Sequence, residues 1–127
     1  MKLSDAEWQI MNALWKRYPA TAREIAGNLP GNIQWAYTTI KTLLARLAAK
    51  SAVSERKLGN TSVYEPLVSL MKARRTALRS LLDRAFDGTV EPLLNFLAEE
   101  RKLSDRQRRE LLKILQNEEA KQGGEND

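Results

Sequence analysis

Residues 35–50 of the chain read WAYTTIKTLLARLAAK, and this stretch decides how the sequence folds. With 100° assigned to each residue, the apolar side chains fall in a single stripe: Ala36, Tyr37, Ile40, Leu43, Leu44 and Leu47. The other sides carry small hydroxyls and cations, namely Thr38, Thr39, Lys41, Thr42 and Arg46. The pattern predicts an amphipathic helix that rests on a core and leaves its hydroxyl-and-cation face outside.

Two shorter helices are predicted before this stretch. Ser4 and Glu7 have the spacing of a capping box, in which each side chain satisfies the backbone N–H of the other residue. The apolar residues that follow predict a helix over residues 5–18. Thr21 and Glu24 repeat the capping pattern and open a helix of about two turns, which stops at a Pro-Gly pair.

A β-hairpin is predicted after the third helix. Residues 53–57 and 61–65 place β-branched or aromatic residues at alternate positions, as strands do. Gly59 and Asn60 tolerate positive φ and suit the tip between the strands. Three helices followed by a hairpin is the order of a winged helix-turn-helix, so the predicted fold class is mainly α with a small β-hairpin.

The helical pattern returns at residue 69, and three helices are predicted in the C-terminal part. Gly88 is expected to end the first helix, and Thr89 and Ser104 to cap the next two. The apolar side chains of these helices are Leu78, Leu81, Leu82, Phe86, Leu93, Leu94, Phe96, Leu97, Leu111, Leu112, Ile114 and Leu115.

About sixty residues make only a marginal core by themselves, so we expect those apolar side chains to form a dimer with a second copy. Packing against the N-terminal part is the alternative. The predicted organisation is a winged-helix DNA-binding domain over residues 1–67, a three-helix dimerisation domain over 68–119 and a disordered tail over 120–127.

The composition excludes most catalytic chemistry. The chain has no cysteine and no histidine, which removes disulfides, thiolate and imidazole metal ligands, cysteine nucleophiles and the usual base of a catalytic triad. We therefore expect neither an enzyme nor a metal or cofactor site. The apolar runs are far shorter than the roughly 20 residues that cross a bilayer, so a cytoplasmic location without membrane contact is expected.

The charge distribution indicates an anionic partner for the N-terminal part. The net charge is +5 overall, and residues 1–67 carry nine Lys or Arg against five Asp or Glu, a net charge of +4. In a winged helix the third helix enters the major groove, where threonine and basic side chains contact bases and phosphates.

The candidate DNA contacts follow from this placement. Thr38, Thr39, Lys41, Thr42 and Arg46 lie on the predicted helix, and Arg56, Lys57 and Asn60 lie on the hairpin, within reach of phosphate or the minor groove. A helix with such a face is by itself more often simply solvated. The short helix before it and the basic hairpin after it favour double-stranded DNA.

Several segments of the chain match the motifs of a known protein family and occur in the same order as they do there. They are residues 6–8 (AEW), 35–47 (WAYTTIKTLLARL), 64–67 (YEPL), 81–88 (LLDRAFDG) and 103–105 (LSD). Together they resemble the penicillinase and methicillin-resistance repressor family over nearly the whole chain. The resemblance implies a homodimeric bacterial repressor whose winged helix binds a palindromic operator and whose C-terminal helices form the dimer.

The resemblance also implies a mode of release. In that family a membrane sensor-transducer responds to a β-lactam, and the repressor is then cleaved at an Asn-Phe bond in its dimerisation region. Asn95 and Phe96 match that bond, although Phe96 also fits a plain core or interface position. The related copper-responsive branch uses a cysteine-rich C-terminal metal site, which a chain without cysteine does not carry.

Two other classes of function stay open at this level. A protein-interaction module would use the basic hairpin and the C-terminal helices to dock an acidic partner, and it would prefer no DNA sequence. A small-molecule-responsive winged-helix regulator would hold its ligand between its two parts, and the ligand would raise its melting temperature.

Overall fold

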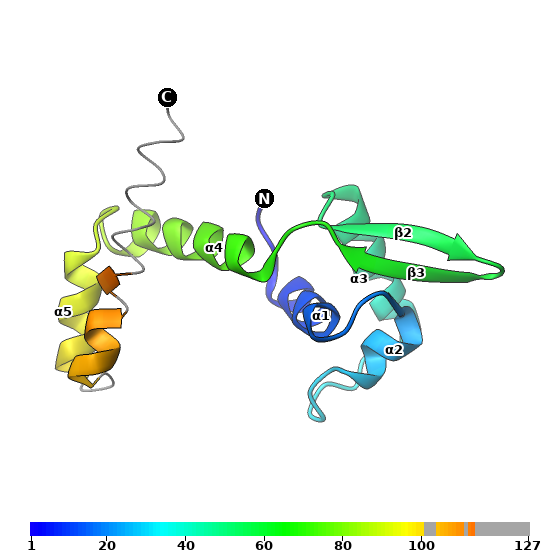
Figure 1. Ribbon diagram of the computed structural model, residues 1–127, viewed down its shortest axis with the longest axis horizontal. Coiled ribbons are helices and arrows are strands. Elements are labelled where there is room, and N and C mark those ends of the chain that lie inside the picture. The colour runs from blue at the N-terminus through cyan, green and yellow to red at the C-terminus, as the bar shows by residue number, and fades with distance from the viewer. Residues whose placement is uncertain (101–103, 111, 114–127) are drawn as a thin grey trace. The chain divides into compact units, whose positions relative to one another are not determined.

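The computed structural model describes residues 1–100, 104–110 and 112–113 of the chain (Figure 1). The chain divides into two units, Met1–Ala73 and Arg74–Asp127. The elements are α1 (Asp5–Lys16), β1 (Ala20–Thr21), α2 (Ala22–Gly27), α3 (Tyr37–Ala49), β2 (Val53–Leu58), β3 (Thr61–Pro66), α4 (Leu70–Ala85) and α5 (Glu91–Glu99). Residues 105–110 and 112–113 are also helical. Leu111, Ile114 and Leu115 of the expected dimerisation set, and the expected tail 120–127, lie outside the described residues.

The two predicted N-terminal capping boxes are both formed. The Ser4 hydroxyl accepts from the backbone N–H of Glu7 at 3.2 Å, and Oε1 of Glu7 accepts from the N–H of Ser4 at 2.8 Å. Thr21 and Glu24 make the same pair of bonds at the start of α2. Helix α1 ends at Lys16 rather than at residue 18, and Arg17 is already extended. The proline at position 19 disfavours the helical conformation for the residue before it.

The core of the first unit lies where α1 and α2 pack against α3. Its largest fully buried apolar side chains are Ile10, Met11, Leu14, Ile25, Ile40, Leu44, Leu47 and Val53. Each such side chain stabilises the fold by roughly 1.5–3 kcal/mol relative to an exposed position. The predicted apolar stripe of the third helix is therefore confirmed from Ile40 onward.

The first turn of α3 departs from the predicted stripe. Ala36 is exposed, and the Tyr37 side chain is 48 % exposed although the helical spacing placed both in the core. The Arg23 guanidinium lies over the Tyr37 ring, 5.4 Å from its centroid. Tyr37 thus contacts a surface cation instead of the core, which an ideal helical wheel cannot anticipate at a helix end.

The predicted hairpin is present, and a third strand completes it. Strands β2 and β3 are antiparallel and join through Gly59 and Asn60, with Glu55 opposite Tyr64 in the register. Figure 1 shows the hairpin extending beyond α1, α2 and α3. Strand β1 pairs with the other edge of β3, so the order is β1-β3-β2. Strand β1 was not predicted from the sequence, because two residues are too short for an alternation pattern.

An ion pair between the buried carboxylate of Glu7 and the exposed Lys50 joins the start of α1 to the end of α3. Glu7 is 2 % exposed, and its Oε1 accepts a hydrogen bond from Nζ of Lys50 at 2.6 Å. Lys50 also donates to the carbonyl of Lys2 at 2.8 Å. Burial raises the pKa of Glu7, but the hydrogen bonds from Lys50 and Ser4 outweigh burial, so the pKa is lowered overall.

The segment before α4 is bound to the first unit. The indole Nε1 of Trp15 donates to the carbonyl of Val68 at 2.9 Å, and the N–H of Leu67 donates to the carbonyl of Ala52 at 2.8 Å. Ser69 then caps α4 by accepting from the N–H of Lys72. These bonds set the direction in which the chain leaves β3.

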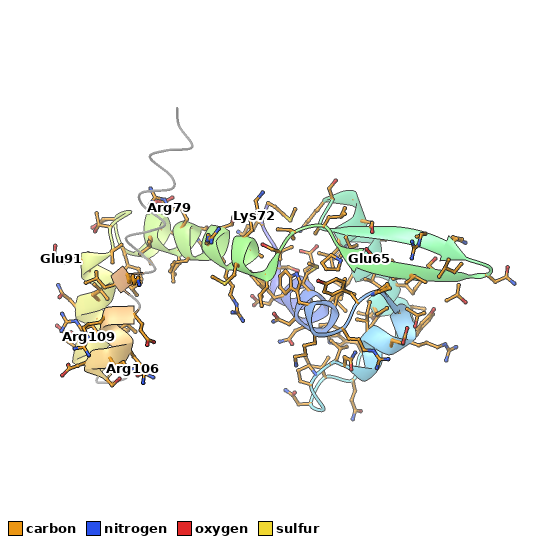
Figure 2. The ribbon with its side chains drawn as sticks, viewed as in Figure 1. Glu65, Lys72, Arg79, Glu91, Arg106 and Arg109 are labelled. Atoms are coloured by element: carbon orange, nitrogen blue, oxygen red, sulfur yellow. The ribbon has the colours of Figure 1, made fainter. Side chains whose placement is uncertain are left out.

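The second unit has its own small apolar cluster. Leu82, Val90, Leu93 and Leu94 are buried there, and Leu78, Phe86, Leu97 and Leu112 pack around them. Charged side chains such as Glu91, Arg106 and Arg109 lie on its outside (Figure 2).

The caps in the second unit agree with the prediction at two of three places. Helix α4 ends in a turn with positive φ at Asp87 and Gly88, and the Gly88 N–H bonds to the carbonyl of Leu82. Ser104 forms its capping box with Gln107. The expected cap at Thr89 is wrong: its hydroxyl donates to the carbonyl of Phe86, and Val90 stands at the N-cap of α5.

Candidate nucleic-acid interface

The outer face of α3 carries the predicted hydroxyls. Thr38, Thr39, Thr42 and Arg46 are exposed. Thr38 and Thr42 lie on the side opposite the buried leucines of the helix, and Thr39 and Arg46 lie on its flanks. Lys41 is partly buried. Small side chains on this face allow the helix backbone to approach a surface closely, and the single long guanidinium of Arg46 extends beyond them. The face has the size and chemistry that a major groove accepts.

Thr42 shows which of its groups remains free for a partner. Its hydroxyl donates to the carbonyl of Thr38 at 2.9 Å, one turn earlier in the helix. The donor is therefore used within α3, and the oxygen lone pairs and the methyl group of this exposed side chain remain available to a partner. Such a threonine can accept from a cytosine or adenine amino group, or pack against a thymine methyl.

Lys41 belongs to a cluster that joins α3 to the hairpin. Its Nζ donates to the hydroxyl of Tyr64 at 3.3 Å, and that hydroxyl donates to Oε2 of Glu55 at 3.3 Å. The hydrogen bond to Tyr64, with support from Glu55, raises the pKa of Lys41. A hydrogen bond from Ser62, followed by Tyr64 and the nearby lysines, lowers the pKa of Glu55. Both side chains are thus held in their charged forms.

The hairpin presents its two cations on different faces. Arg56, Lys57 and Asn60 are all exposed. In the register Lys57 is opposite Ser62 and Arg56 is opposite Val63, and successive side chains of a strand point to opposite faces. Lys57 therefore shares the face of Glu55 and Tyr64, next to α3, and Arg56 lies on the other face.

Sequence reasoning missed two parts of this surface. Arg23 and Tyr37 form a cation–π pair beside the first turn of α3, and Tyr64 and Glu55 hold Lys41. For the contact between Tyr64 and Glu55, the sequence does contain a signal: the alternation in the hairpin places these two side chains on one face. The Arg23 pair has no signal in the sequence, because it joins residues of two different helices.

The side chains expected at a dimer interface divide into two groups. Most of those that the structure describes belong to the cluster within the second unit itself. Leu81 and Phe96 do not: their side chains are 41 % and 51 % exposed. Asn95 is exposed beside Phe96, and both residues lie within α5. Leu81 therefore leaves apolar surface uncovered on α4, and Phe96 does so on α5.

The described part of the chain contains neither a metal-binding cluster nor a membrane-spanning helix. Among residues 1–100, 104–110 and 112–113, no cluster of three acidic side chains is arranged to hold a metal ion. No helix in the same part of the chain is long and apolar enough to cross a membrane.

The three helices with their small antiparallel sheet, and the exposed polar face of α3 beside the hairpin, define a winged-helix protein of the DNA-binding class. Residues 3–117 match the family described as penicillinase repressor. The chain belongs to this family, whose members are DNA-binding transcriptional repressors and not enzymes.

Individual relatives agree with this assignment. The chain is 34 % identical over 116 residues to the penicillinase repressor of Bacillus licheniformis, across 91 % of this chain and 90 % of the relative. It is 27 % identical over 114 residues to the methicillin resistance regulatory protein MecI of Mammaliicoccus sciuri, across 90 % of this chain and 93 % of the relative. The solution structure of the DNA binding domain of the repressor BlaI matches with a TM-score of 0.50 and 32 % identity, covering 56 % of this chain and 87 % of that one.

Proposed function

We propose that the chain is a homodimeric repressor that reads a palindromic operator with α3 and the hairpin, and that cleavage in its second unit releases the operator. The observation that carries the proposal is the exposed face of α3, where Thr38 and Thr42 lie opposite the buried leucines and Arg46 lies exposed on the flank. Thr38 and Thr42 read bases, with Thr39 as a neighbour. Arg46 and the hairpin residues Arg56, Lys57 and Asn60 contact phosphates or the minor groove.

Selection of duplexes from a random library, followed by footprinting, tests the proposal. We expect a preferred sequence with two inverted half-sites about one helical turn apart or a multiple of it, because a two-fold dimer presents two copies of α3. Equal affinity for all duplexes would contradict sequence reading and favour a protein-interaction module.

The variants Lys41→Ala and Arg46→Ala are expected to weaken binding to the selected duplex. If the substituted residue contacts a phosphate, the slope of log Kd against log salt concentration should also be smaller for the variant by about one unit, because one fewer counterion is released. Lys16→Ala is the matched control, since it removes an exposed cation of the same unit from α1. Unchanged binding by both variants would remove α3 as the reading element.

Support for dimer formation comes from the exposed apolar side chains of the second unit. Leu81 and Phe96 extend the apolar surface beyond the unit's own cluster, and a second copy would cover them. Two copies on one operator also bind more tightly than one, because the second contact is intramolecular.

Cleavage between Asn95 and Phe96 would remove half of that surface. Both side chains are exposed, but the bond lies inside α5, so a protease needs the helix to open locally. We expect cells exposed to a β-lactam to contain a fragment that ends at Asn95, with weaker operator binding. Intact-mass measurement of the recovered protein checks this, and induction with only full-length chain present would contradict it.

A further inference from the structure

Tyr64 is a buried tyrosine whose hydroxyl lies between two charged side chains from different elements. Its side chain is 3 % exposed and belongs to the core of the first unit. The hydroxyl accepts from Nζ of Lys41 on α3 and donates to Oε2 of Glu55 on β2. The Lys41 ammonium also lies 5.9 Å from the centroid of the Tyr64 ring. One hydroxyl on β3 therefore connects α3 with β2.

The hydrogen bond that the Tyr64 hydroxyl donates to Glu55 strengthens the one that it accepts from Lys41. A phenol that donates to a carboxylate becomes a better acceptor, because hydrogen bonds in a chain polarise one another. The carboxylate of Glu55 is itself hydrogen-bonded by Ser62. An ammonium has three donors, so the bond to Tyr64 leaves two for another partner.

We propose that Tyr64 is a positioning residue for sequence recognition: its hydroxyl holds the Lys41 ammonium where it reaches a base edge rather than the nearest phosphate. The inference rests on the proposed function, because it concerns how α3 distinguishes one duplex from another.

The preference arises from restricted freedom of the lysine. A free lysine side chain is flexible, and ordering it costs side-chain entropy. Anchoring by Tyr64 removes part of this freedom before DNA arrives. Phosphates occur along every duplex and base acceptors only in some sequences, so a lysine fixed toward the groove favours particular sequences.

The burial of Tyr64 makes the proposal testable. A side chain that is 3 % exposed has almost no surface with which to contact DNA. Tyr64→Phe keeps the ring in the core and removes only the hydroxyl. Any change in DNA binding by this variant must therefore pass through its two hydrogen-bond partners, and a cycle with Lys41→Ala identifies the lysine as the partner responsible.

The experiment compares the wild type, Tyr64→Phe, Lys41→Ala and the double variant, as full-length chains. Two probes are used: a duplex with the sequence that the wild type selects from a random library, and a duplex with the same bases shuffled. Dissociation constants come from fluorescence anisotropy of labelled duplexes. Tyr18→Phe is the matched control, because it removes the hydroxyl of an exposed tyrosine outside α3 and the hairpin.

We expect Tyr64→Phe to bind the selected duplex about tenfold more weakly, as for loss of a hydrogen bond to a charged group. Binding to the shuffled duplex and binding by Tyr18→Phe should stay at the wild-type level. In the Lys41→Ala background, Tyr64→Phe should not change the dissociation constant for the selected duplex any further. This holds even if the substitution lowers the melting temperature of the protein.

Equal losses on both duplexes, or additive effects in the double variant, would overturn the inference while leaving the proposed function intact. A wild type that selects no sequence would instead overturn the proposed function itself.

Discussion

Glu7 differs most from what its residue type implies. A glutamate at the third position of a helix is ordinarily a surface residue, but this one lies in the core next to Lys50. The lowered pKa means that the folded state holds the charged carboxylate more strongly than the unfolded chain does. Its contribution to stability is therefore complete above the ordinary value of 4.5 and is lost as the pH falls through the lower, folded pKa.

Glu7→Gln should reduce this pH dependence. The amide oxygen still accepts from the N–H of Ser4, so the cap remains, but no group titrates. We expect the free energy of unfolding, measured by urea titration from neutral pH to acid, to fall less steeply in the variant than in the wild type.

Asp5→Asn is the control, because it removes an exposed carboxyl from the same turn of α1. An equal pH slope in Glu7→Gln and the wild type would show that Glu7 is not the titrating group.

Single-residue environments were only partly predictable from the sequence. The capping function of Ser4 and Glu7 follows from their spacing, because both partners belong to one helix turn. The bonds from Lys50 to Glu7 and from Lys41 to Tyr64 join residues far apart in the chain. Such pairs depend on how helices and strands are packed together, and local patterns contain no information about that.

At the scale of elements, the hairpin tip depends on a conformation that glycine adopts freely. Gly59 has a φ of +66°, and nothing lies within 4 Å of a Cβ added there. A substitution would therefore strain the backbone without causing a clash. Gly31 also has open space around it, but no φ in the left-handed region.

Gly59→Ala is expected to destabilise the first unit by about 1–2 kcal/mol, the ordinary penalty of a left-handed L residue. Gly31→Ala, the matched control, should be neutral or stabilise by about 0.4–1 kcal/mol through the unfolded chain. Chemical denaturation followed by circular dichroism checks both. Equal effects of the two variants would mean that the tip adopts another turn in solution.

The elements themselves were predicted well where a periodic pattern was long. The stripe of α3 and the alternation of β2 and β3 repeat often enough to identify their type. The ends were less predictable: Tyr37 left the stripe, and Val90 replaced Thr89 as the cap of α5. Helix ends depend on neighbouring side chains and on competing turns, such as the bond from Thr89 to Phe86.

For the whole molecule, the proposed dimer involves one of two adjacent residues of α4 that have different surroundings. Leu82 is buried in the cluster of the second unit, whereas Leu81 is 41 % exposed. The sequence predicted both as dimerisation residues, because a run of leucines does not distinguish a side chain that packs within its own chain from one that a second copy covers. We propose that Leu81 belongs to the second kind.

If the proposed dimer forms through this residue, Leu81→Asp should convert it to a monomer, because a carboxylate would be buried at the contact without a partner. Helix content should be retained, since the side chain is outside the local cluster. Sedimentation velocity checks the mass and circular dichroism the helix content. Leu58→Asp, at an exposed leucine of the hairpin, is the control. A Leu81→Asp chain that still sediments as a dimer would place the contact elsewhere.

The hydrogen bond between Trp15 and Val68 gives this protein a built-in optical probe. Trp8, Trp15 and Trp35 are the three tryptophans of the sequence, and all of them precede residue 74. Indole emission therefore reports on the first unit alone, and the second unit melts without a signal at these wavelengths. Because the Trp15 ring nitrogen is bonded where the chain leaves β3, a red shift in emission would register release of that segment before any helix is lost.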